Sequence, residues 1–436
     1  MNDMSRPPHE HAPLSYSQQQ LWFLQQYEPG LTAYNLTRAF RLTGALDRAA
    51  LSAALDALQA RHAILRTRFA ETDGLPYQQA VPPFPVQLAW LDLRQLPPQQ
   101  REQRLQEELQ AAAAHVFDLG QAGQLDVRLI ALGPQEHVLV IGMHHIVSDA
   151  WSNPLVIRDL AEAYRQARRD GQAQLPALPM QYADYAHWQR QRVQSAWLAD
   201  ELRYWDDYLG PVNSSLDLPT DRPRPARQSF RGAVHAFTLD SALAQQMQAF
   251  CRAQHCTPFV ALMAAWQVLL SRYSGQADFL VGAPHAGRNH AELQDLVGFF
   301  VTTQLYRARL TPELTVRELV RQVRGDMLAA LEHGDLPFEA LLEHRKVERD
   351  PGRNPLFQVM FGLQMVGEGA SALAFDDIVT APLPLAQDSA KFDLSLDVKV
   401  IKGEVHCRLE YASDLFDAAT IAAMAGHYQN LLRGFA

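Results

Sequence analysis

Hydrophobic positions along the chain follow two spacings, one typical of helices and one typical of buried strands. Leu51, Leu55 and Leu58 lie on one stripe of an amphipathic helix predicted over 47–61. The run HVLVIGMHH at 137–145 is continuously apolar and contains β-branched residues, which predicts a strand buried on both faces. Further helices are predicted near 17–27, 97–115, 154–168, 182–208, 240–273, 314–331 and 417–433, and further strands near 36–44, 278–283, 299–310, 355–365, 391–400 and 404–411. Because helices and strands mix in both halves, we predict an α/β fold.

Two proline-containing stretches interrupt these patterns. They cover 171–181 and 217–232, and the second holds three prolines in sixteen residues. We place a lobe boundary between them. The predicted organisation is a leader at 1–14, an N-terminal lobe at 15–180, a helix and Pro-rich connector at 181–232, and a C-terminal lobe at 233–436.

Composition and charge exclude several classes of protein. The chain has 436 residues, of which 47% are hydrophobic and 20% charged, so it is neither disordered nor collagen-like nor a coiled coil. Its net charge of −9 and the absence of a basic run argue against a nucleic-acid partner. Neither a signal-peptide core nor a run of about 18 apolar residues is present, so we expect a cytoplasmic chain without a membrane partner.

Cysteine usage adds little chemistry. The three cysteines form an odd set in a long chain, which implies no disulfide framework. Cys251 and Cys256 are interpreted as reduced and partly buried residues rather than a metal pair. No P-loop, G-x-S-x-G or H-E-x-x-H sequence occurs, and GEGASA at 367–372 falls short of a dinucleotide-binding loop. The HEH at 9–11 is interpreted as a chance cluster in the leader.

The segment MHHIVSDAWS at 143–152 carries the strongest chemical signal. His144 and His145 close the predicted strand, and neighbouring side chains on a strand point to opposite faces. One imidazole should therefore face a cavity and the other the scaffold. A histidine in such a place suits proton handling near neutral pH, although a pair of ordinary structural histidines is the alternative. Asp149 is placed to brace the following turn, and Ser152 or Asn153 to cap a helix that begins at Pro154.

Seven segments in order give the chain a family resemblance. The whole series resembles the condensation domain of nonribosomal peptide synthetases, a family that resembles chloramphenicol acetyltransferase in fold. The segments are LSYSQQQLWFL (14–24), RHAILRTRF (61–69), MHHIVSDAWS (143–152), QYADYAHWQ (181–189), VGFFVTTQLYR (297–307), HGDLPFEALL (333–342) and RDPGRNPLFQVMF (349–361). The third matches the family's HHxxxDG active-site motif.

The resemblance implies a fold and an activity. It implies two chloramphenicol acetyltransferase-like lobes that form a V-shaped pseudo-dimer with a central tunnel. Such domains join an acyl group, held as a thioester, to the amine of an acceptor in the synthesis of antibiotics, siderophores and lipopeptides. The implied partners are peptidyl or acyl carrier domains and an adjacent adenylation domain, with acyl-CoA as a further donor. No metal or tightly bound cofactor is implied, since phosphopantetheine arrives on a carrier or as coenzyme A.

The same resemblance assigns roles to residues of this chain. His145 is the expected catalytic histidine, which accepts a proton from the amine or positions it, and His144 turns toward the scaffold. Asp149 is expected to hold the loop by pairing with Arg66. The expected tunnel residues are Ala150, Trp151, Ser152 and Thr302. Alanine at 150 departs from the usual glycine and threonine at 302 from a frequent asparagine.

The sequence narrows the subtype of condensation domain that the chain resembles, but it leaves several alternatives open. The two histidines disfavour a cyclising relative, in which both are aspartates. SDAWS resembles the types that take an L-aminoacyl or fatty-acyl donor, and the initial methionine with its short leader favours a starter (lipoinitiation) role over elongation. An ester-forming acyltransferase and a non-catalytic recruitment platform remain alternatives, although platform relatives have lost the histidines.

Overall fold

The computed structural model of this chain describes residues 11–212, 215–347, 350–366, 373, 375, 377–385 and 389–436. The first ten residues of the predicted leader, with most of the HEH cluster, lie outside this part, as do GEGASA at 367–372 and the first residue of the seventh motif. The described residues form two compact units. Unit 1 draws on Met1–Ser195, Arg288–Val301 and Gly369–Ala386, and unit 2 on Ala196–Gly287, Thr302–Glu368 and Gln387–Ala436.

This division differs from the predicted contiguous lobes. Two segments of the predicted C-terminal lobe, 288–301 and 369–386, belong to unit 1. The single helix predicted over 182–208 is two helices, α5 (Tyr182–Val193) in unit 1 and α6 (Trp197–Leu209) in unit 2. Between them the N–H groups of Gln194 and Ser195 bond to carbonyls three residues back, which ends the α-helical ladder without a proline or glycine.

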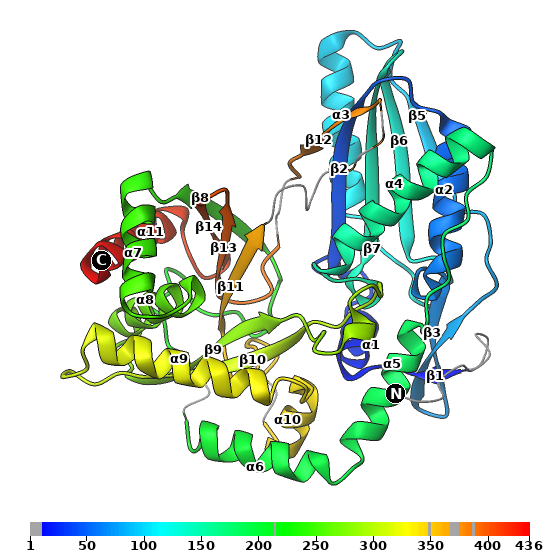
Figure 1. Cartoon of the computed structure of the whole chain (residues 1–436). Coiled ribbons are helices and arrows are strands. Elements are labelled where there is room, and N and C mark those ends of the chain that lie inside the picture. Colours follow the sequence, from blue (N-terminus) through cyan, green and yellow to red (C-terminus); the bar gives the residue numbers. More distant parts are fainter. Residues whose placement is uncertain are drawn as a thin grey trace. The chain divides into compact units, whose positions relative to one another are not determined.

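Unit 1 contains a five-stranded sheet in the order β12-β2-β7-β6-β5 (Figure 1). Its strands are β12 (Val379–Leu383), β2 (Asn35–Thr43), β7 (Glu136–His144), β6 (Leu125–Gly133) and β5 (Leu88–Asp92). Neighbouring strands are antiparallel except β5 and β6. A small second sheet has the order β1 (Ala12–Pro13), β4 (Leu75–Ala80), β3 (Thr67–Thr72).

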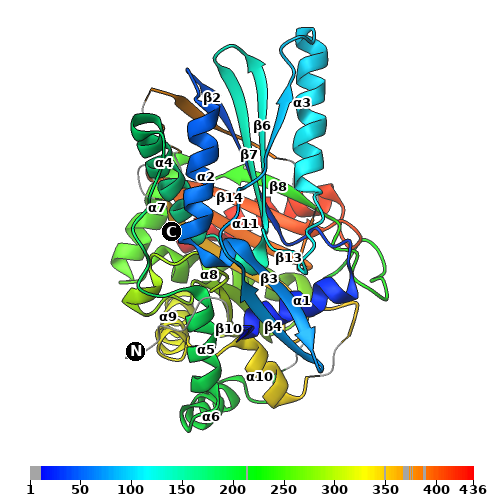
Figure 2. The ribbon, with the colours of Figure 1, turned by 90° about the vertical axis from the view of Figure 1, so that its right-hand side faces the viewer.

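Helices cover both faces of the unit 1 sheet (Figure 2). On one face, Leu139 and Ile141 of β7 share a core with α2 (Arg48–Arg61) and α4 (Ser152–Asp170). On the other, Val138 and Val140 pack with α3 (Pro98–Ala113). This burial on both faces explains the unbroken apolar run of β7. The remaining helix, α1 (Tyr16–Tyr27), begins at Ser15, whose side chain accepts a hydrogen bond from the Gln18 N–H in a capping box.

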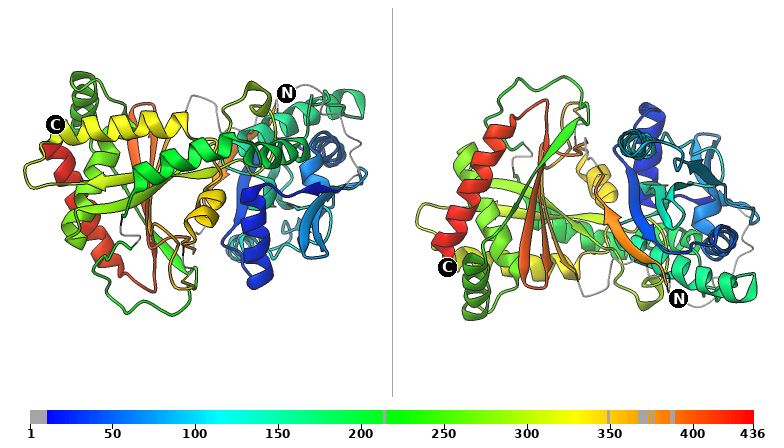
Figure 3. Two further views of the ribbon diagram at one scale, coloured as in Figure 1. Left: turned by 90° about the horizontal axis from the view of Figure 1, so that it is seen from below. Right: turned by 90° about the horizontal axis from the view of Figure 1, so that it is seen from above.

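Unit 2 contains a six-stranded sheet in the order β10-β9-β11-β13-β14-β8 (Figure 3). The strands are β8 (Gly232–Thr238), β9 (Asp278–His285), β10 (Thr302–Arg309), β11 (Val359–Val366), β13 (Leu394–Ile401) and β14 (Glu404–Ala412). Its further helices are α7 (Ser241–Ala253), α8 (Pro258–Ser274), α9 (Val316–Glu332), α10 (Phe338–Arg345) and α11 (Ala418–Phe435). The α8 helix is buried nearly all round, because α7, α9 and α11 all contact it.

The remaining expectations concern membrane-spanning helices, the cysteines and the fold class. None of the described helices is long and apolar enough to cross a membrane. The three cysteines are free, with Cys251 and Cys407 buried and Cys256 partly buried. The mixed α/β class predicted from the sequence is confirmed by these sheets and helices.

Candidate active site

The end of β7 separates the two histidines of the third motif. His144 is the last residue of β7, pairs with Asn35 of β2 and is only 1% exposed. Its Nδ1 accepts a hydrogen bond from the Ile146 N–H at 3.1 Å, so its ring belongs to the scaffold. His145 begins the short 3-10 turn η2 (His145–Val147), and its side chain is only partly buried. Its backbone N–H donates to the Tyr34 carbonyl at 2.8 Å.

Two aromatic rings contact the imidazole of His145. The Phe299 ring lies edge-on to it, with centroids 4.7 Å apart and planes at 64°. The Tyr34 ring is 6.5 Å away at 69°. Burial raises the pKa of Tyr34 to about 12, so this phenol stays protonated near neutral pH.

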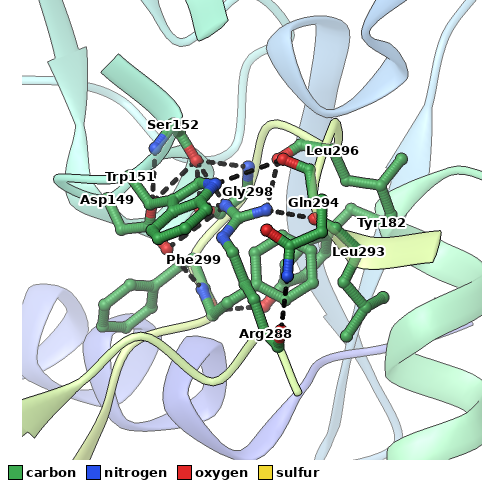
Figure 4. A network of polar contacts seen from close by, with 11 residues as sticks. Asp149, Trp151, Ser152, Tyr182, Arg288, Leu293, Gln294, Leu296, Gly298 and Phe299 are labelled. Atoms are coloured by element: carbon green, nitrogen blue, oxygen red, sulfur yellow. Dashed lines mark hydrogen bonds and ion pairs between the residues drawn. The ribbon is translucent and has the colours of Figure 1, made fainter. Parts of the chain in front are cut away.

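Asp149 is enclosed by hydrogen-bond donors (Figure 4). Its Oδ1 accepts from the backbone N–H and the hydroxyl of Ser152, both at 2.7 Å. Its Oδ2 accepts from the Phe300 N–H at 3.0 Å. The guanidinium of Arg288 reaches both oxygens, at 3.3 and 3.5 Å. A carboxylate that is 2% exposed and already holds these donors acts as a brace.

The predicted partnership of Asp149 with Arg66 is wrong. Arg66 lies in the 3-10 turn Ala63–Arg66, and its Nη1 donates instead to the Val81 carbonyl. The arginine that meets Asp149 is Arg288, whose side chain is 1% exposed and also donates to the Leu293 and Leu296 carbonyls. It lies over the Phe300 ring, 4.0 Å from the centroid. Burial lowers the pKa of Arg288, and the charge of Asp149 opposes that shift.

Ser152 belongs to the same network and does not line open space, contrary to the prediction. It is fully buried, and its Oγ accepts from the Gly298 N–H at 3.1 Å and from Arg288 Nη2 at 2.9 Å. Its single hydroxyl proton faces two acceptors, Asp149 Oδ1 and the Gly298 carbonyl. Ser152 also begins α4, whereas the sequence predicted a start at Pro154. The Asp149 carboxylate, rather than Ser152 or Asn153, accepts from the first turn of that helix.

The other predicted tunnel residues are dispersed. Ala150 is exposed and its φ is not positive, so alanine fits this turn without strain. Trp151 is 45% exposed, and its Nε1 donates to the Gln294 carbonyl at 3.2 Å. Thr302 begins β10 in unit 2, where its Oγ1 accepts from the Phe338 N–H at 3.4 Å. The tunnel itself stays a prediction.

Sequence reasoning quoted the motifs at 181–189 and 297–307 but assigned no role to Tyr182, Gly298 or Phe299. The structure places all three beside the loop after β7 that carries His145 and Asp149. The Tyr182 hydroxyl donates to the Phe299 carbonyl at 2.5 Å, and the Ser15 hydroxyl lies 2.9 Å from the same phenol oxygen. Arg288 lay in no quoted motif, and no local signal marked it among the arginines. Elsewhere in the described residues, no group of three or more metal-ligating side chains occurs.

Comparisons with known proteins identify a family to which the chain is similar. The family model described as "Condensation domain" matches residues 9–436. A linear gramicidin synthase of Brevibacillus parabrevis is 42% identical over 428 residues, which cover 98% of this chain and 6% of that relative. Tyrocidine synthase 3 of the same organism is 35% identical over 424 residues, which cover 97% of this chain and 6% of that relative. The chain thus spans a small fraction of the length of these relatives.

Solved structures agree as well. The X-domain from teicoplanin biosynthesis has a TM-score of 0.89 and 30% identity, with 99% of this chain and 95% of that one covered. The same kind of domain in a complex with OxyB matches with a TM-score of 0.89 and 29% identity, covering 99% and 94%. The predicted chloramphenicol acetyltransferase-like fold class is confirmed by these matches. With its HHxxxD segment at the end of β7, the chain belongs to the condensation-domain family of nonribosomal peptide synthetases.

Proposed function

We propose that this chain forms an amide bond between a thioester-held acyl donor and the amine of a carrier-bound aminoacyl acceptor, with His145 as the catalytic residue. One observation carries the proposal. Of the two adjacent histidines, His144 is buried and bonded to the backbone, whereas the His145 imidazole is partly exposed at the strand end. A side chain must be reachable if it is to meet an amine.

Amide formation needs a side chain that can accept a proton from the amine or hold the amine in place, and the His145 imidazole is such a group. A free amine is mostly protonated at pH 7 and attacks only as the neutral form. Its nitrogen bonds to the thioester carbonyl carbon, the carbon–sulfur bond breaks, and the sulfur leaves as a thiol that takes one proton. His145 accepts the proton of the attacking amine or holds that amine in line, and both roles fit an imidazole. Alignment of the two reactants supplies a large part of the rate.

Asp149 has a supporting role in this proposal. Both of its oxygens are engaged by Ser152, Phe300 and Arg288. The carboxylate is also only 2% exposed, so it is not open to substrate. It therefore holds the loop that carries His145 and takes no proton from substrate.

The proposed partners follow from the family. The donor and acceptor arrive on the phosphopantetheine arms of carrier domains, with coenzyme A as a second donor carrier, and an adenylation domain of the same synthetase loads the acceptor. The relation to synthases many times longer than this chain supports such a setting. A starter role uses a fatty acyl donor and an elongation role uses an aminoacyl carrier, and we propose the amide-forming step common to both.

The test uses intact mass spectrometry of the acceptor carrier. The protein is incubated with carrier domains loaded with a panel of amino acids, first with mixed acyl-CoAs and then with an aminoacyl-loaded donor carrier. A mass gain of one acyl chain indicates a starter role, and a gain only with the donor carrier indicates elongation. The gain should vanish in His145→Ala and persist in His427→Ala, where the lost imidazole pairs with Tyr273 in unit 2. Absence of gain in every arm overturns the proposal.

Recruitment of another protein is the second candidate. It is favoured by the similarity to a teicoplanin X-domain solved in a complex with OxyB. A platform needs no reachable histidine, so His145→Ala would leave partner binding intact while no acyl transfer occurs in the wild type. An acceptor bearing a hydroxyl in place of the amine tests ester formation in the same assay.

A further inference from the structure

We propose that Phe299 is a positioning residue for His145, and that Asp149 influences catalysis through Phe299. The inference rests on the proposed function, since it names how the catalytic imidazole is held. Its starting point is the contact between the Phe299 and His145 rings, 4.7 Å apart at 64°. Phe299 reaches this place from a segment that lies more than 150 positions further along the chain.

The backbone on either side of Phe299 is fixed by side chains of unit 1. The N–H and the carbonyl of Gly298 both bond to Ser152 Oγ, at 3.1 and 2.9 Å. The Phe299 carbonyl accepts from the Tyr182 hydroxyl at 2.5 Å. The Phe300 N–H donates to Asp149 Oδ2 at 3.0 Å. Consecutive peptide groups are thus held by three different side chains, and Figure 4 shows the segment beside them.

Gly298 makes this close approach possible. A Cβ at this position would lie 2.0 Å from Cδ2 and 2.5 Å from Cε2 of Tyr182, far inside van der Waals contact. The Tyr182 ring is 1% exposed, so it has little room to move aside. The tyrosine ring therefore packs directly against the backbone of Gly298, and this contact fixes the position of the next residue, Phe299.

The ring of Phe299 then restricts the imidazole. It is 8% exposed and meets His145 in the edge-to-face geometry that aromatic pairs prefer. The Tyr34 ring lies 6.5 Å from the same imidazole, between ring centroids. The backbone carbonyl of Tyr34 accepts a hydrogen bond from the His145 N–H. A catalytic side chain needs its rotamer fixed by such packing, because small misplacements reduce the rate strongly.

Asp149 acts on this arrangement through the backbone. Its carboxylate bonds to the N–H of the residue that follows Phe299, while Arg288 and Ser152 fix the carboxylate itself. Loss of the Asp149 carboxylate frees Phe300 and with it the adjacent ring. Substitutions at Asp149 and Phe299 should therefore affect one property, the position of His145, and their effects should not add.

The first experiment compares Phe299→Leu with Phe299→Tyr in the acyl-transfer assay. The leucine variant keeps an apolar side chain without a ring, and we expect kcat to fall about 10- to 100-fold with an unchanged KM for the carrier. The tyrosine variant keeps the ring and should restore most of kcat. Phe237→Leu in β8 of unit 2 is the matched control and should retain wild-type kcat. A kcat of Phe299→Leu equal to that of the wild type overturns the proposal.

The second experiment is independent of turnover. Histidines labelled with carbon-13 are titrated by NMR, and the His145 resonance is assigned as the one missing from His145→Ala. Phe299→Leu should shift this resonance and its titration midpoint, and Phe237→Leu should not. If the wild type transfers no acyl group, the proposed function fails, and the NMR comparison still tests the contact between Phe299 and the imidazole. An unmoved resonance in a folded Phe299→Leu protein contradicts the positioning role.

The link to Asp149 has its own test. In a double-mutant cycle, Asp149→Asn with Phe299→Leu should lower kcat no further than the more severe single change. A product of the two separate losses would show that Asp149 acts by another route.

Discussion

Asp149 and Arg288 are separated by 139 positions in the sequence, yet their side chains form an ion pair that is 2% and 1% exposed. This pair fastens the segment 288–301 to the loop after β7, and it explains why that segment belongs to unit 1 although its chain neighbours belong to unit 2. The pair also bonds to Leu296 and Phe300, on either side of the Phe299 ring that contacts His145.

Removal of Arg288 should destabilise the protein strongly. Arg288→Ala leaves the Asp149 carboxylate buried without its cation, and such a change costs about 3–5 kcal/mol. Urea unfolding of wild type and variant measures the loss. A double-mutant cycle with Asp149→Ala should give a clear coupling energy for Arg288, and none for Arg66→Ala, because Arg66 bonds to Val81. Coupling to Arg66 alone would restore the pairing expected from the sequence.

Gly298→Ala should be far more harmful than an ordinary glycine substitution. The new Cβ would meet the Tyr182 ring at 2.0 Å, and overpacking of this kind costs about 1–3 kcal/mol or more. Gly325→Ala in α9 is the control, since no side chain or backbone beyond its own helix and chain neighbours lies within 4 Å of its added Cβ. Alanine there should stabilise the helix by about 0.5–1 kcal/mol. Thermal unfolding compares the two, and equal midpoints would mean that Tyr182 yields.

Ala150→Gly should widen the range of accepted acyl donors without a gain in stability. Ala150 is exposed with an ordinary φ, so glycine relieves no strain and only adds backbone freedom. Competition between acyl donors of different size, followed by mass spectrometry, measures the range. An unchanged donor profile would mean that the methyl group of Ala150 does not limit which acyl donors are accepted.

His62 should make the fold sensitive to acid. Its Nε2 lies 2.8 Å from Asp159 Oδ2, and it is 1% exposed. Burial lowers the pKa of His62; hydrogen bonding and the charge of Asp159 raise it, and the charges of Arg61 and Arg158 lower it further. The folded pKa thus lies below the unfolded value of about 6.5, so the unfolded chain takes up the proton first as the pH falls. Stability should therefore be complete above about pH 6.5 and decline below it.

The measurement is the free energy of unfolding at pH 7.5 and at pH 5. In His62→Gln the decline over this interval should be smaller, by up to about 1.4 kcal/mol per pH unit below pH 6.5. His137 and His285, whose pKa values burial also lowers, remain in the variant, so some decline persists. An identical decline in both proteins would show that His62 takes up its proton equally in the folded and unfolded states.

Elements with a strong hydrophobic signal were predictable from sequence. The β7 strand and the α2 helix carry unbroken or periodic apolar residues because each is buried against neighbouring elements. The β5 strand was missed, since its LAWLD sequence lies at the sheet edge with no buried residue. The break between α5 and α6 was missed because it uses Gln194 and Ser195 rather than a helix-breaking residue.

The candidate site likewise has features that the sequence predicts and features that it does not. The sequence by itself determined what is local: two histidines at the end of a buried strand and a carboxylate four residues later, since strand alternation and turn geometry act between near neighbours. The tertiary structure alone decided which arginine pairs with Asp149, that Ser152 is enclosed, and that Phe299 contacts His145. Those choices depend on the packing of segments far apart in the chain, where many side chains of the same type compete and only the folded geometry selects among them.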